Sequence, residues 1–133
     1  MKILAGPAAL VGRFLLSIIF LVSAYGKITG FKGSAEFMAT KMPFSMPLIY
    51  IMLAGATTFE VVGGLSVLTG YKARFGAALL FLFLVPTTVI FHNVLVDPSQ
   101  KNAFLKNAAI LGALLLVMVQ GSGPMSVDKP SEG

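Results

Sequence analysis

The chain has 133 residues, of which 56% are hydrophobic and only 11% are charged. Soluble domains carry about 25% charged residues, so this composition excludes an ordinary soluble fold and predicts a chain that folds in lipid. The absence of cysteine excludes disulfide exchange, thiolate catalysis and iron–sulfur ligation, while one histidine and five acidic residues argue against a metal site.

Four apolar stretches are long enough to cross a bilayer, which takes about 20 residues per helix. We therefore predict an all-α fold, an integral membrane four-helix bundle that forms one domain over residues 1–133. The polar end of the chain, rich in Gly, Ser and Pro, is expected to be flexible. The predicted spans are residues 7–27, 47–70, 73–96 and 103–120, and the polar tail is 121–133.

The net charge of +5 comes from basic residues near the ends of these stretches. Lys and Arg at such positions anchor helices to anionic lipid headgroups, so we expect the lipid bilayer as the partner and no nucleic acid. Four spans place both termini on one side of the membrane. The basic residues divide almost equally between the two faces, so they do not fix the orientation, and we expect cytoplasmic termini.

The first stretch has two readings. Met1 and Lys2 form a short basic start before an apolar core, which is typical of a secretory signal. Arg13 interrupts that core, however, and Pro7 suits the first turn of a helix. We therefore expect a permanent transmembrane helix.

The linker between the first and second stretches predicts a short amphipathic helix at the membrane interface. Four of its residues fall on one face at helical spacing: Phe37, Met38, Lys41 and Met42. Pro43 and Pro47 then bracket a turn before the second span.

Glu60 lies well inside the second stretch, where a carboxylate costs about 2.5 to 3.5 kcal/mol unless it has a partner. Arg13 lies roughly 9 Å inside the first stretch from the same membrane face, so we predict an intramembrane ion pair between them. Ser17, four residues after Arg13, is expected to complete the hydrogen bonding. Two alternatives stay open: Arg13 snorkels to the headgroups, or Glu60 is a protonated acid bonded to a carbonyl.

Gly63 and Gly64 follow Glu60 by about one turn. Because glycine has no side chain, we predict that this surface packs closely against a neighbouring helix. Glu60 itself is equally consistent with a structural fastener and with a site for a proton or a ligand.

A second set of polar residues gathers at the opposite membrane face, from the ends of three predicted spans. An imidazole, amides and ammonium groups could together bind a carbonyl oxygen, so we predict a ligand or quinone site here. A belt of headgroup anchors is the alternative for the lysines. The predicted site consists of Lys27, His92, Asn93, Lys106 and Asn107.

These positions also carry a family resemblance over nearly the whole chain. The motifs are RFLLSIIFLVSAYGKITGF from Arg13, FEVVGGLSVLTGYKAR from Phe59, FHN at the end of the third stretch, KNAAILGALLLV from Lys106, and the tail GSGPMSVD. Their order and spacing resemble the DoxX family of small four-span bacterial membrane proteins. The polar and glycine residues that match that pattern are Arg13, Lys27, Glu60, Gly64, His92, Lys106 and Asn107.

The resemblance implies a four-helix bundle in the bacterial inner membrane and an association with redox biology. Some members are the membrane subunit of a thiosulfate:quinone oxidoreductase, and others serve as membrane anchors for soluble oxidoreductases. Because the chain has no intrinsic redox cofactor that we can identify, we assign no catalytic residue and no metal, and expect at most a bound quinone.

Three functions follow, in order of preference. The first is an accessory or scaffold subunit of a membrane redox complex, with a larger oxidoreductase as its partner. The second is the quinone-binding subunit of a thiosulfate:quinone-type oxidoreductase. The third is a small proton-coupled transporter in which Glu60 titrates.

Overall fold

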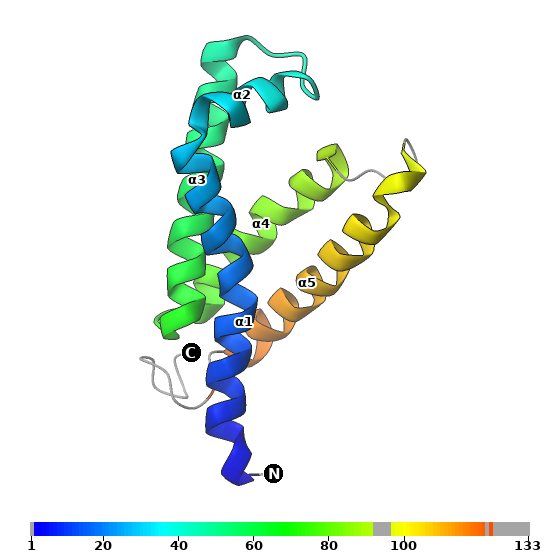
Figure 1. Cartoon of the computed structure of the whole chain (residues 1–133). Helices are drawn as coiled ribbons and strands as arrows, with labels where there is room; N and C mark the ends of the chain where they lie inside the picture. Colours follow the sequence, from blue (N-terminus) through cyan, green and yellow to red (C-terminus); the bar gives the residue numbers. More distant parts are fainter. Residues whose placement is uncertain (1, 92–96, 122, 124–133) are drawn as a thin grey trace.

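The computed structural model describes residues 2–91, 97–121 and 123, and these residues are helical apart from short connections. Four of the helices are long and apolar enough to cross a membrane, which confirms the predicted fold class. The fifth is the expected short helix between the first and second spans. In chain order the elements are α1 (Lys2–Thr29), α2 (Phe31–Ala39), α3 (Met46–Thr69), α4 (Ala73–Phe91), a 3-10 turn η1 (Pro98–Gln100) and α5 (Lys101–Gln120) (Figure 1).

The first helix begins before the point that the sequence predicts. Helix α1 starts at Lys2, so Pro7 lies inside the helix and not in its first turn. Proline lacks the N–H that would bond to the carbonyl four residues earlier, and this loss falls close to the start of the helix. The helix therefore continues through Pro7.

The connection between α3 and α4 is a tight turn. Gly70 adopts the left-handed conformation at φ 80° and ends α3, which glycine does at little cost. The hydroxyl of Ser66 then donates to the carbonyl oxygens of Tyr71 at 2.5 Å and Lys72 at 2.9 Å. These bonds hold α3 and α4 as antiparallel neighbours.

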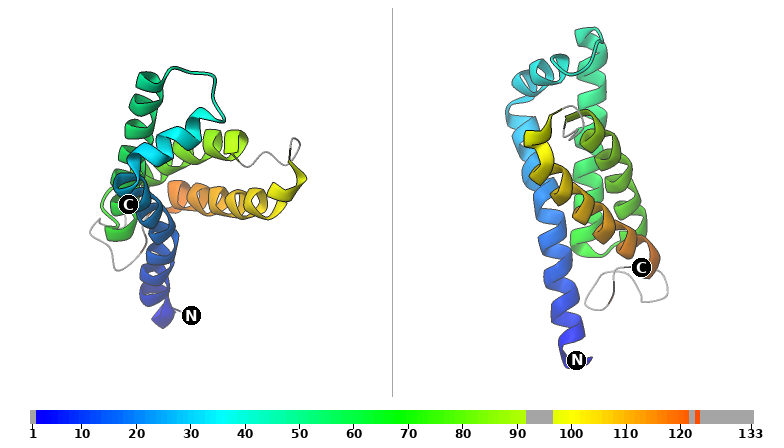
Figure 2. Two further views of the ribbon diagram at one scale, coloured as in Figure 1. Left: turned by 45° about the horizontal axis from the view of Figure 1, so that its top comes forward. Right: turned by 90° about the vertical axis from the view of Figure 1, so that its right-hand side faces the viewer.

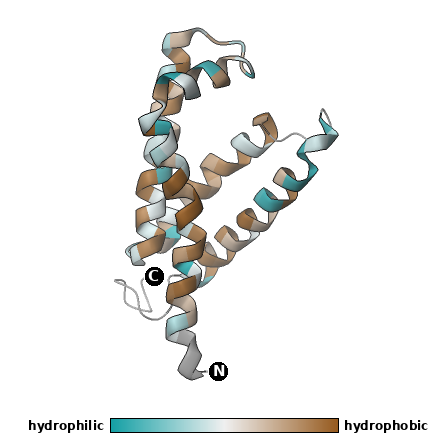
Figure 3. Ribbon diagram, in the orientation of Figure 1, coloured by the Kyte–Doolittle hydropathy of each residue, from teal (hydrophilic) through white to brown (hydrophobic). Residues whose placement is uncertain are grey.

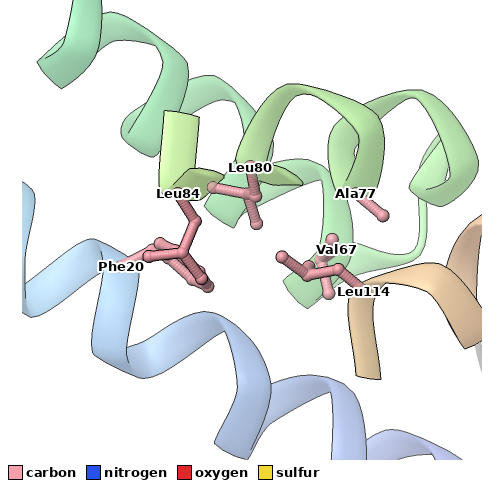
Figure 4. Close-up of a cluster of buried hydrophobic side chains, with 6 residues drawn as sticks. All are labelled: Phe20, Val67, Ala77, Leu80, Leu84 and Leu114. Carbon is pink, nitrogen blue, oxygen red and sulfur yellow. The ribbon is translucent and has the colours of Figure 1, made fainter. Parts of the chain in front are cut away.

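Helix α3 lies between α1 and α4, and α5 packs against α4 (Figures 1 and 2). Four of the helices contribute to the main hydrophobic core. Figure 4 shows its side chains converging from α1, α3, α4 and α5: Phe20, Val67, Ala77, Leu80, Leu84 and Leu114.

A smaller cluster fixes the interfacial helix. Ala35 of α2 is fully buried against Ile49 and Leu53 of α3, and the rings of Phe31 and Tyr50 stack with their centroids 5.6 Å apart. This packing holds α2 across the end of the bundle at which α1 ends and α3 begins (Figure 1).

The outer surface of the long helices is apolar, as a lipid environment requires. Large hydrophobic side chains such as Leu15, Ile51 and Val119 are more than half exposed. Figure 3 shows hydrophobic residues along the long helices, with hydrophilic ones on α2, at η1 and at the start of α5. At η1, hydrogen bonds from Ser99 to the carboxylate of Asp97 lower the pKa of Asp97.

The two ends of α3 meet α4 differently. Near the Gly70 turn the two helices pack closely, and toward α2 they diverge, so that α4 leans away from α3 (Figures 1 and 2). The close packing depends on glycine. A Cβ placed on Gly63 would lie 2.7 Å from Leu80 Cγ and 2.9 Å from the carbonyl oxygen of Gly76, and a Cβ on Gly76 would overlap Ser66.

Gly64, the next residue, packs against a different helix. A Cβ on Gly64 would lie 2.8 Å from Leu21 Cδ2 on α1. Successive residues of a helix point about 100° apart, so Gly63 faces α4 while Gly64 faces α1. The pair lets the central helix approach both neighbours at the same depth.

Candidate functional site: a cavity around an intramembrane ion pair

Glu60 forms an ion pair with Lys27 of α1. The ammonium nitrogen of Lys27 lies 2.6 Å from Glu60 Oε1 and donates a second hydrogen bond of 2.7 Å to the hydroxyl of Ser23. It also lies 5.3 Å from the centroid of the Phe83 ring, within the range of a cation–π contact. The Glu60 side chain is 1% exposed and that of Lys27 is 23% exposed.

The predicted pair between Arg13 and Glu60 is therefore corrected. Arg13 instead donates to the carbonyl oxygen of Leu68 at 3.3 Å, eight residues beyond Glu60 on α3. Eight residues of helix span about 12 Å, so Arg13 lies at the C-terminal end of α3 and is too far from the Glu60 carboxylate to pair with it. Counting depth from the ends of the apolar stretches placed Arg13 and Glu60 too close together.

Lys27 reaches Glu60 although it lies in the last turn of α1. Helical side chains tilt toward the N-terminus of their own helix, so its long stem runs back into the bundle. The sequence predicts Lys27 in the polar set at the membrane face. The spacing of Ser23 and Lys27, four residues apart on one helix face, was the available sign that Lys27 could point inward.

Arg13 and Ser17 belong to the other end of the bundle. Arg13 is 4% exposed, and its guanidinium bonds to one of the last carbonyls of α3, where the helix dipole favours a positive charge. The hydroxyl of Ser17, fully buried, donates to the carbonyl oxygen of Phe14. Arg13 therefore ties α1 to the C-terminal end of α3, whereas the Ser17 bond lies within α1.

The Lys27–Glu60 pair forms part of the wall of a cavity of about 830 Å³, to which all five helices contribute. This volume lies within the range of small-molecule sites, about 300 to 1,000 Å³. Aromatic rings from α1, α2 and α4 make up much of the apolar wall. The polar and charged side chains around it are Ser23, Lys27, Ser34, Lys41, Glu60, Thr87, Gln100, Lys106 and Asn107.

Three of the predicted ligand residues line this cavity, namely Lys27, Lys106 and Asn107. The other two, His92 and Asn93, lie outside the described residues. The structure also adds members that the sequence did not single out for the site, chiefly Glu60 and Ser23. The predicted pair with Arg13 places Glu60 nearer the opposite face, so the sequence does not assign Glu60 or Ser23 to this site.

Asn107 connects α5 to α4 beside the cavity. Its side-chain nitrogen donates to the hydroxyl of Thr88 at 3.1 Å, and that hydroxyl donates to the carbonyl oxygen of Leu84 at 2.8 Å. Asn107 and Thr88 are 5% and 4% exposed. Their contact fixes the position of the α5 wall relative to α4.

The chemistry of the cavity suits an oxygen-bearing head group. Lysine residues line it from α1 and α5, and Glu60 contributes a carboxylate from α3. Flat rings, including those of Phe83 and Phe91, offer surfaces for a ring to stack on. The arrangement can hold and orient a polar ring, and can donate hydrogen bonds to its oxygens.

Comparisons with known proteins agree with this architecture. The chain is 34% identical over 131 residues to the Escherichia coli inner membrane protein YqjF, covering 97% of this chain and 95% of that protein. It is 30% identical to the E. coli inner membrane protein YphA, over 90% and 87% of the two chains. No solved structure matches.

A more distant similarity extends beyond bacteria. The yeast ER-derived vesicles protein ERV29 is 34% identical over 127 residues, which cover 85% of this chain but 41% of that protein. The two E. coli relatives and the four spans together make this chain a multi-pass inner membrane protein. The sequence model named DoxX matches residues 8–93, so the chain belongs to the DoxX family.

Proposed function

We propose that this protein is a small membrane subunit of a quinone-linked redox complex and that its cavity holds the quinone head group. The observation that carries the proposal is the direction of Lys27. A lysine at the end of a membrane helix can extend to the headgroups, but this one turns inward to Glu60. An inward ammonium at the edge of a cavity is a hydrogen-bond donor for a ligand.

The charges and rings support a quinone in particular. A quinone has two carbonyl oxygens on opposite sides of a flat ring. Lys27 on α1 and Lys106 on α5 both line the cavity, so each of two walls carries a lysine that can donate to one of these oxygens. Phe83 lies beside the Lys27 ammonium and offers a stacking surface for the ring.

We place the protein in a complex because some members of the DoxX family are the membrane subunit of a thiosulfate:quinone oxidoreductase. Because the sequence has no cysteine and no identifiable redox centre, electrons would pass between the quinone and a substrate or a partner subunit. This assigns a binding role to the chain and leaves electron delivery to its partner.

The test is the quinone content of protein purified from its native membrane in mild detergent. We expect bound quinone in the wild type, and a loss of affinity of about tenfold or more in Lys27→Gln, because a charged hydrogen bond contributes roughly 1.5 to 3 kcal/mol. Lys32→Gln is the matched control, since Lys32 is an exposed residue of α2 that does not line the cavity.

Two results would contradict the proposal. One is a wild-type protein that co-purifies with a large oxidoreductase but carries no quinone, which would favour a scaffold. The other is a Lys27→Gln variant that folds and keeps its full quinone content.

A further inference from the structure

A second cavity of about 340 Å³ lies between α2, α3 and α4. Among the described residues around it, threonine is the only one with a polar side chain. Three methionines form part of the wall, from α2, the segment after it, and α3: Met38, Met42 and Met52. Methionine is flexible and adapts to irregular apolar shapes. The cavity is therefore suited to a hydrocarbon group of variable conformation.

The two cavities adjoin. Five residues line both: Met38, Ala56, Phe83, Thr87 and Phe91. Ala56 is the smallest of these, and it lies one turn before Glu60 on the same face of α3. These shared residues place the methionine-lined cavity directly beside the polar one.

The second cavity opens toward the lipid-facing surface. Two of its lining residues are exposed hydrophobic side chains, Phe59 at 38% and Leu82 at 63%. Gly55 lines it as well, and a Cβ built on Gly55 meets no atom within 4 Å. This space exists because α3 and α4 diverge from their close contact at Gly63 and Gly76.

We propose that the second cavity holds the apolar tail of the ligand whose head group lies in the first, and that the tail reaches the bilayer between α3 and α4. The inference rests on the proposed function and narrows it. The ligand is an amphiphile with an oxygen-bearing ring and a long hydrocarbon chain, and a compact quinone without a chain binds weakly.

The test compares two probes on the detergent-purified protein. One is 2,3-dimethoxy-5-methyl-1,4-benzoquinone, which has no tail, and the other is its 6-decyl derivative. Gly55 lines the second cavity and a Cβ there meets no atom within 4 Å, so Gly55→Leu adds a side chain to this wall without a clash at Cβ. We expect this variant to bind the decyl quinone about tenfold more weakly and the tailless quinone unchanged, since the added side chain occupies space that only the decyl tail uses.

Gly112→Leu is the matched control. Gly112 is a helical glycine of α5 at which a Cβ also meets no atom within 4 Å, and it lines neither cavity. We expect this variant to bind both probes as the wild type does. A second blocking variant, Met52→Trp, changes a residue that lines only the second cavity, and it should reproduce the selective loss of the decyl quinone.

The outcomes separate the tail assignment from the proposed function. If Gly55→Leu binds the decyl quinone as tightly as the wild type, or loses both probes equally, the tail assignment is wrong. If the wild type binds both probes equally and Lys27→Gln loses both, the head-group site stands and the tail site does not. A wild type that binds neither probe overturns both proposals.

Discussion

The two ends of the bundle use their polar and small residues in opposite ways. At one end, which we call the glycine end, Gly63, Gly64 and Gly76 bring three helices into contact, and Arg13 bonds to the end of α3. At the other, the cavity end, α3 and α4 diverge, and Lys27 and Glu60 lie beside open space. Close contact at one end thus leaves room for a ligand at the other.

This contrast separates structural polar groups from functional ones. The guanidinium of Arg13 satisfies a helix terminus, which is a fixed requirement of the fold. The Lys27–Glu60 pair also ties two helices, yet the Lys27 side chain is partly exposed and lines the cavity. Substitutions at the two ends should therefore affect stability and ligand binding to different extents.

The largest expected effect comes from replacing one glycine with alanine at each end of the bundle. Gly63→Ala should destabilise the protein by about 3 kcal/mol, because the added Cβ would lie 2.9 Å from the backbone oxygen of Gly76. Gly55→Ala at the cavity end should stabilise it by about 0.5 to 1 kcal/mol, since the space is open and alanine favours the helix.

The free energy of unfolding of both variants can be measured in mixed micelles by titration with a denaturing detergent, followed by circular dichroism. Equal effects at the two positions would show that the ends do not differ in packing.

Lys27→Met should have the next largest effect, about 2 kcal/mol, because it leaves the Glu60 carboxylate buried without this partner. The double variant with Glu60→Leu should recover most of that loss, since apolar replacement of a whole buried pair is often close to neutral. The same unfolding titration gives the coupling energy through a double-mutant cycle. Additive losses from the two substitutions would mean that the pair does not act as a unit.

Arg13→Lys should cost about 1.5 kcal/mol, because lysine cannot reproduce the guanidinium geometry at the end of α3. In contrast to substitution of Lys27, it should leave the affinity for the decyl quinone within twofold of the wild type. The unfolding titration and a binding isotherm on one preparation give both quantities. A large drop in affinity would show that Arg13 is coupled to the cavity and that the separation between the ends fails.

The sequence was sufficient to predict the four spans and the interfacial helix because each is a local pattern of apolar residues ended by glycine, proline or charge. The partner of Glu60 was not predictable in the same way. That choice depends on the tilt of α1 against α3 and on the direction of the Lys27 stem, and the apolar stretches encode neither. The cavity depends on the divergence of α3 and α4, which also arises from tertiary packing.

Thr88→Val is expected to have the smallest effect. It tests whether the bond between Asn107 and Thr88 contributes to ligand binding as well as to stability. It removes the hydroxyl that accepts from Asn107 and keeps nearly the same volume, so the loss should be about 1 kcal/mol. Thr58→Val is the control, because the Thr58 hydroxyl donates to the carbonyl oxygen of Ala54 within its own helix and Thr58 lines neither cavity. If Asn107 only ties α5 to α4, Thr88→Val lowers stability and leaves quinone affinity unchanged. If the tie also positions the cavity wall, the affinity of Thr88→Val falls as well, because release of the amide lets the α5 wall, including Lys106, shift away from the ligand.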